Sequence, residues 1–190
     1  MAEELDGGQD QQQPRGLVVS TLAILLTLAA LGWAVDLYRK IGLLLIDEQF
    51  NAIVLAVAIA LVFLSRRATK GSSGPPPWYD IVAACLGMVA ALYVAYDYRA
   101  LSDSIAFRPL HGVIIGGILL ALVLEGLRRV SGNFLTIILF AFIAYGFLGH
   151  LIPGDFQGRH VTPNGLLLYL SLDVNGVFGS VFGVAATIVV

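Results

Sequence analysis

The chain has 190 residues, of which 58% are hydrophobic and only 13% are charged. Water-soluble domains contain about 45–50% apolar and about 25% charged residues, so this composition excludes a soluble globule and a disordered acidic protein. The net charge of −2, without a long basic run, argues against nucleic acid as a partner, and the single cysteine excludes an internal disulfide.

Six charge-free apolar runs predict transmembrane helices, because a spanning helix needs about 20 mostly apolar residues and a charge at mid-bilayer is costly. Continuous apolar character, without alternation, favours helices over barrel strands. The predicted fold is therefore all-α, a polytopic transmembrane helical bundle with about five full spans and the start of a sixth. In chain order the runs are Gly16–Val35, Gln49–Ser65, Ile81–Tyr96, Pro109–Leu124, Val130–Gly154 and Val174–Val190.

The segments between the runs suggest three parts. Residues 1–15 are polar and predict a disordered cytoplasmic tail, whose acidic start argues against a secretory signal. Residues 16–149 form the predicted transmembrane region. Residues 150–190 contain a predicted outer loop, a half-buried or interfacial helix at Leu166–Leu172, and the start of the sixth span.

Two compact basic clusters predict the orientation. Arg66, Arg67 and Lys70 follow the second run, and Arg128 and Arg129 follow the fourth. Both clusters lie on one side if the odd-numbered helices run from inside to outside. Because basic residues concentrate in cytoplasmic loops, the N-terminus is predicted to be cytoplasmic.

The last run reaches Val190 without a polar residue. A terminal carboxylate buried in hydrocarbon is costly. We therefore expect the sequence to be the front part of a longer polypeptide, or one half of a split one. A helix that lies flat in the membrane interface is the alternative.

No residue pattern predicts catalysis, cofactor binding or a metal site. The sequence lacks a GxxxxGK[ST] phosphate loop. His111 starts a helix, while His150 and His160 flank a loop, so a metal-ligand set would need distant partners, and we interpret all three as interfacial polar residues. An integral-membrane enzyme is therefore disfavoured.

Two groups of charged residues are candidate functional sites. Glu125 precedes Arg128 by three and Arg129 by four positions, which places all three on one helix face. This spacing predicts an anchor at the inner interface, made of a salt bridge and snorkelling arginines. On the outer side, two loops are candidate docking surfaces for an external protein, with a solvated hairpin cap as the alternative. Their charged residues are Asp97, Arg99, Asp103 and Arg108 in Tyr96–Pro109, and Asp155 and Arg159 in Pro153–Pro163.

Glycines occur at several positions in the predicted apolar helices. Small residues let helix backbones approach each other closely, so these positions predict tight packing. The glycines concerned are Gly116, Gly117, Gly126, Gly146 and Gly149.

Short motifs follow one another in a fixed order between Trp78 and Val190. They are Tyr96…Arg99…Asp103, Leu124–Arg129 (LEGLRR) with Ser131-Gly132, Tyr145-Gly146 before Leu151–Gly154 (LIPG), Gly158-Arg159-His160, and Leu168-Tyr-Leu followed by Asn175–Thr187. In this order they resemble the N-terminal part of the fused permease of TAXI-type tripartite ATP-independent periplasmic (TRAP) transporters. Gly126 departs from the alanine that is more common in that family.

The resemblance implies a multi-pass secondary transporter of the bacterial inner membrane. Such permeases import a solute that a periplasmic binding protein delivers, using an ion gradient that is commonly sodium. In that family the front helices form a scaffold arm like the separate small subunit, and a later, larger domain holds the substrate and ion sites in discontinuous helices.

Residues 16–149 are accordingly expected to be a scaffold and receptor-docking arm. Its partners would be the lipid bilayer, the periplasmic receptor and the large permease domain, and no substrate-binding residue is assigned in this chain. The alternative is a self-contained membrane adaptor or anchor subunit of another complex, without transport activity.

Overall fold

The computed structural model describes residues 13–35, 37–40, 42, 45–66, 77–104, 107, 109–173 and 176. Within these residues the fold is all-helical, and five helices are long and apolar enough to cross a membrane. The long helices are α2 (Gln13–Ala34), α4 (Asp47–Ser65), α5 (Trp78–Ser104), α6 (Leu110–Ser131) and α7 (Asn133–Leu148), and the short elements are α3 (Leu37–Lys40), the 3-10 turn η2 (Gly149–Leu151) and α8 (Pro163–Ser171). The predicted bundle with five spans is confirmed, and the protein is a multi-pass membrane protein. Residues 1–12 of the predicted tail and the predicted sixth run, apart from Gly176, lie outside the described residues.

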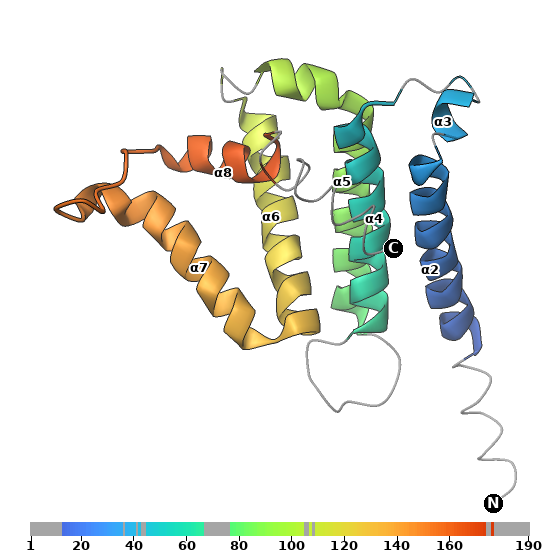
Figure 1. Ribbon diagram of the computed structural model, residues 1–190. Helices are drawn as coiled ribbons and strands as arrows, with labels where there is room; N and C mark the ends of the chain where they lie inside the picture. The colour runs from blue at the N-terminus through green and yellow to red at the C-terminus, as the bar shows by residue number, and fades with distance from the viewer. Residues whose placement is uncertain are drawn as a thin grey trace, which may run out of the picture.

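Helices α4, α5 and α6 form the core (Figure 1). Fully buried alanines, Ala52 and Ala56 on α4 and Ala91 on α5, bring these two helices together. A β-carbon on Gly87 of α5 would lie 2.5 Å from Ile59 of α4 and 3.0 Å from Leu122 of α6. The missing side chain at Gly87 therefore allows three helices to meet at one point.

Helix α2 packs at the edge of this core, and its main contact with another long helix is with α4 (Figure 1). The rings of Trp33 and Phe50 stack with centroids 4.1 Å apart and planes 7° apart. Leu26 and Ala29 pack on the same buried pair, Phe50 and Val54. The remaining apolar surface of α2 is exposed, as expected of a helix that faces lipid.

Helix α7 diverges from α6, and α8 returns from its far end to α6 (Figure 1). Gly146 of α7 faces Leu166 of α8, while Gly116 of α6 faces Ser171 of α8. Leu168 of α8 is buried in the main core. The predicted helix at Leu166–Leu172 is thus confirmed, with one face buried.

Two predicted boundaries are wrong. Helix α2 already includes residues 13–15 of the predicted disordered tail, because Pro14 near its start favours helix initiation. The run Val130–Gly154 is divided at Gly132, whose φ of 85° ends α6. Helix α7 then begins at Asn133, where the Thr136 hydroxyl donates to the Gly132 carbonyl at 3.1 Å.

The predicted loop Tyr96–Pro109 is also wrong in its first part, because α5 continues as a helix to Ser104. The backbone of Asp97 leaves helical geometry (φ −111°, ψ 22°), and the helix continues beyond this kink across the end of the bundle (Figure 1). Tyr98 and Leu101, three residues apart on this segment, are both buried in the core. Their burial keeps the segment helical despite its polar neighbours.

The contact between α6 and α8 predicts different effects for two adjacent glycines. A β-carbon on Gly116 would collide with the Ser171 hydroxyl and lie 3.1 Å from its β-carbon, whereas one on Gly117 would meet nothing within 4 Å. We expect Gly116→Ala to destabilise the protein by about 1–3 kcal/mol through overpacking. Gly117→Ala is expected to be neutral or stabilising, because alanine favours helix over glycine. Unfolding of the detergent-solubilised variants, followed by tryptophan fluorescence, measures the difference, and equal effects would contradict the contact.

Candidate functional site

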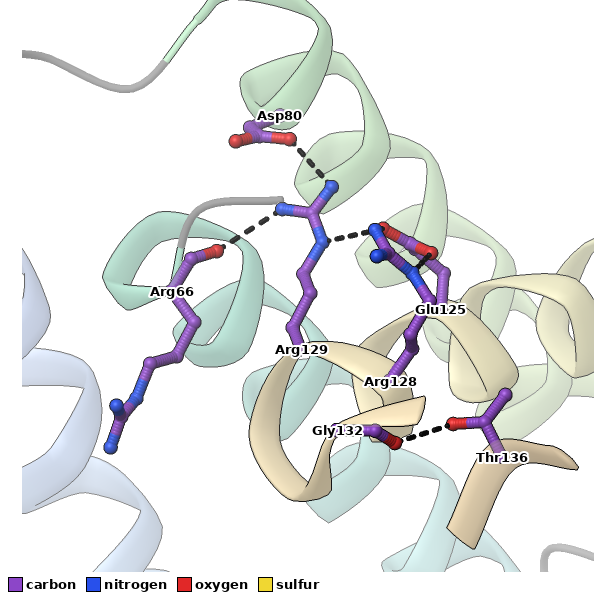
Figure 2. A network of polar contacts seen from close by, with 7 residues as sticks. All are labelled: Arg66, Asp80, Glu125, Arg128, Arg129, Gly132 and Thr136. Atoms are coloured by element: carbon purple, nitrogen blue, oxygen red, sulfur yellow. Dashed lines mark hydrogen bonds and ion pairs between the residues drawn. The ribbon is translucent and has the colours of Figure 1, made fainter. Parts of the chain in front are cut away.

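The ends of three core helices meet at one end of the bundle (Figure 2). Arg66 directly follows α4, Asp80 lies in the first turn of α5, and Arg129 lies in the last turn of α6. An acidic residue at a helix N-terminus and a basic residue at a C-terminus both interact favourably with the helix dipole. The local positions of Asp80 and Arg129 therefore suit their charges before any tertiary contact forms.

Arg129 connects all three helices. Its Nη2 lies 2.8 Å from Oδ1 of Asp80, and its Nε donates to Oε1 of Glu125 at 2.8 Å. Its Nη1 donates to the Arg66 carbonyl at 3.1 Å, and its guanidinium carbon lies 4.3 Å from the centre of the Phe63 ring. Arg66 takes part only through its backbone, since its guanidinium points away from the others (Figure 2). One side chain thus contacts α4, α5 and its own helix.

The pair between Asp80 and Arg129 is almost completely buried, with side-chain exposures of 0% and 4%. Its 2.8 Å separation makes it an ion pair, yet neither oxygen of Asp80 makes a well-aligned hydrogen bond to any of the described residues. The buried carboxylate therefore depends on Arg129 for its stabilisation. Losing one partner of such a pair leaves an uncompensated charge.

Arg128 pairs with the same glutamate closer to solvent. Its Nε lies 2.7 Å from Oε2 of Glu125, and its Nη2 donates to Oε1 at 2.7 Å. The Arg128 side chain is 37% exposed. The predicted pairing of Glu125 with Arg128 and Arg129 is confirmed, but the predicted snorkelling is wrong for Arg129. That side chain turns inward because α5 places a carboxylate within its reach.

Residues that the sequence did not single out complete this network, namely Asp80, Phe63 and the carbonyl of Arg66. A feature of the sequence could have identified Asp80 as a partner of these arginines. Asp80 is an acidic residue immediately before a charge-free run, on the predicted side of the membrane that also carries Arg128 and Arg129. No such feature identifies Phe63, because it is one apolar residue among many in its run.

Neutral hydrogen bonds hold the opposite end of α5. The side-chain amide of Gln49, in the first turn of α4, donates to the Ala95 carbonyl at 2.9 Å, just before the kink at Asp97. A kink frees carbonyls that a regular helix would pair, so this bond satisfies a group that the kink exposes. Beyond the kink, the buried Tyr98 hydroxyl donates to the Leu172 carbonyl at 3.1 Å.

The candidate docking residues lie near this opposite end. Asp97 is half-buried at the kink, while Arg99 and Asp103 are exposed on the helical segment beyond it. Asp155 and Arg159 are exposed in the loop between η2 and α8. Arg108 lies outside the described residues.

The loop after α7 folds back on itself. Gly158 donates its backbone N–H to the Gly149 carbonyl at 2.9 Å, and the Tyr145 hydroxyl donates to the Phe156 carbonyl at 2.8 Å. This closure brings His150 and His160 into contact, with ring centroids 4.7 Å apart. The sequence pattern places the two histidines at either side of a loop and does not predict this contact.

No family model, curated protein or solved structure matches the chain. The resemblance to TAXI-type TRAP permeases therefore stays a prediction. The geometry itself shows charged groups that pair with one another at a junction of helix ends, an arrangement suited to fixing helices in place.

The buried pair predicts a strong and asymmetric response to mutation. Arg129→Met leaves Asp80 buried without a counter-charge, and we expect a loss of about 3–5 kcal/mol in unfolding free energy. The double variant Asp80→Leu with Arg129→Met removes both charges and is expected to recover most of that loss. Unfolding in mixed detergent micelles measures all three proteins.

Arg128→Ala is the matched control, since it removes a neighbouring arginine from the same glutamate. Because that pair is partly exposed, the expected loss is below about 1 kcal/mol. Equal losses for Arg128→Ala and Arg129→Met would contradict the central role of the buried pair.

Proposed function

We propose that the chain is the scaffold and receptor-docking portion of a TRAP-type secondary transporter of the bacterial inner membrane. The observation that carries the proposal is the position of the buried network. Glu125 and Arg129 belong to the LEGLRR motif, and Arg129 joins α6 to α4 and α5. A motif of the resemblance thus coincides with the contact that joins the core helices, which is the property a scaffold requires.

The distribution of charged and apolar side chains supports the proposed scaffold role. In the part of the chain that the structure describes, the ion pairs gather where α4 ends and α5 begins, beside the last turns of α6. Helices α2 and α7 carry exposed apolar side chains over most of their length. These surfaces are available to lipid and to the large permease domain that the proposal includes as a partner.

The proposed orientation puts the Asp80–Arg129 network at the cytoplasmic face. Arg66 follows α4, and Arg128 and Arg129 lie in the last turn of α6, so all three are at this side, in keeping with the excess of basic residues at the cytoplasmic face. The kinked end of α5 and the loop after α7 then face the periplasm. Exposed aromatic side chains, Phe107 and Phe156, accompany the charged candidates there, and aromatic residues are enriched in protein interfaces.

Cysteine labelling tests the orientation. In a Cys85→Ser background, Asp103→Cys and Asp155→Cys are expected to react with a membrane-impermeant maleimide on intact spheroplasts. Ser65→Cys and Ser131→Cys, exposed at the other end, are the matched controls and should react only after permeabilisation. The reverse pattern would overturn the proposed topology.

Photo-crosslinking tests the docking role. A photoreactive amino acid at position 103 or 155 is expected to capture a periplasmic solute-binding protein that mass spectrometry identifies, and the same group at position 65 or 131 should not. The solute released from the captured receptor then supplies the substrate for uptake assays. Proteoliposomes that contain this chain alone should show no sodium-driven uptake of it. Uptake by the chain alone would refute the scaffold role, and capture only of proteins unrelated to solute binding would favour an adaptor of another complex.

A further inference from the structure

The loop after α7 holds two imidazoles in a defined arrangement. Its ends are tied by the bond from Gly158 N–H to the Gly149 carbonyl, and its turn at Gly154 adopts a φ of 93°. The amide of Gln157 adds a weaker contact to the His150 carbonyl at 3.5 Å. His150 is half-buried at one side of this closure, and His160 is exposed at the other.

The separation of the two rings suits a shared metal ion. Imidazole nitrogens bind Zn²⁺ at about 2.0–2.1 Å, so two rings on one ion at angles between square and tetrahedral have centroids about 4.5–5 Å apart. The centroids of His150 and His160 are 4.7 Å apart, with planes inclined by 74°. A shared ion would require the exposed His160 side chain to rotate, so that one of its nitrogens and one nitrogen of His150 face a common point.

The hydrogen bonding of His150 also fits a metal ligand. Its Nδ1 lies 3.1 Å from the Phe147 carbonyl. Because a carbonyl only accepts, Nδ1 carries the hydrogen, and the neutral ring presents Nε2 as a free lone pair. Ligating histidines in proteins commonly donate their other ring N–H to a carbonyl in this way, which fixes the ring and its tautomer.

We propose that His150 and His160 bind a divalent transition-metal cation of the Zn²⁺ or Ni²⁺ class. Imidazole favours these ions, whereas Ca²⁺ and Mg²⁺ prefer oxygen ligands. Within the described ranges no group of three His, Cys, Asp or Glu side chains gathers, so water completes the coordination and the ion exchanges with solvent. The bound ion joins the end of α7 to the segment that leads into α8, and thereby fixes the loop. This proposal is independent of the transport role.

Calorimetric titration tests the site. The full chain, purified in detergent without a polyhistidine tag, is titrated with zinc chloride and nickel chloride. We expect one ion per chain, and His150→Ala and His160→Ala should each weaken binding about tenfold or more. His111→Ala is the matched control, since this exposed histidine lies outside the pair, and it should leave the affinity unchanged. Magnesium chloride should give no binding heat.

Trypsin provides a second readout, because Arg159 precedes His160 in the exposed loop. Zinc is expected to slow cleavage after Arg159 in the wild-type chain and to have no effect on it in His160→Ala. Cleavage after the exposed Arg99 serves as the internal control for any effect of zinc on the protease. Absence of binding, or binding that neither variant of the pair weakens, would overturn the proposal. The proposal would also be overturned if His111→Ala weakened binding as much as His150→Ala and His160→Ala do.

Discussion

The buried ion pair between Asp80 and Arg129 is the contact on which the arrangement of the core depends. Helices α4 and α5 meet through alanines, whose burial distinguishes poorly between one register and another. In a membrane the hydrophobic effect adds little to helix association, because lipid tails are as apolar as the side chains they replace. Close packing and polar contacts must then decide which helix faces lie together. A buried carboxylate with one counter-charge accepts a single arrangement, because any rotation or slip of α5 against α6 would leave it unpaired.

The two ends of α5 are held by different physical means. At its start, a buried charge is balanced by a charge from α6. At its kink, Gln49 hydrogen-bonds the Ala95 carbonyl, and Tyr98 hydrogen-bonds the chain directly after α8. Neutral hydrogen bonds cost less to break than a buried ion pair. The end that carries the candidate docking residues is therefore the more adaptable of the two, and the charged end supplies the fixed reference.

The sequence predicts the spans well because each span is encoded locally, in a continuous run without charge. It fails where the structure depends on contacts between distant segments. Residues beyond Asp97 read as a loop because they mix charges with aromatics, and only the burial of Tyr98 and Leu101 against the core keeps them helical. The predicted pairing around Glu125 was correct because positions three and four apart on one helix meet by geometry alone. The ion pair of Arg129 with Asp80 joins residues on different helices, so no local spacing predicts it.

The glycines of α6 also show that a local sequence pattern does not predict contacts between distant segments. Gly116 and Gly117 are adjacent and chemically identical, yet one meets Ser171 of α8 and the other faces open space. Which of them permits close packing depends on where α8 crosses α6, and no local pattern encodes that crossing. Position along a run therefore predicts that a helix exists, and tertiary contact decides which of its small residues matter.

The crossing of α8 over α6 also determines how α7 is presented. Helix α7 leaves α6 at Gly132 and is apolar on all sides, so it lacks a stripe that would dock it against the core. Leu166 of α8 contacts it at Gly146, while Leu168 and Ser171 of α8 contact α6 at Gly112 and Gly116. Helix α8 thus lies between the far end of α7 and α6, and α7 stands apart from α4 and α5 (Figure 1). Because α7 does not pack against these core helices, most of its apolar side chains are exposed. This is the form expected of a helix that faces lipid, and it follows from the contacts of α8 with Gly112, Gly116 and Gly146.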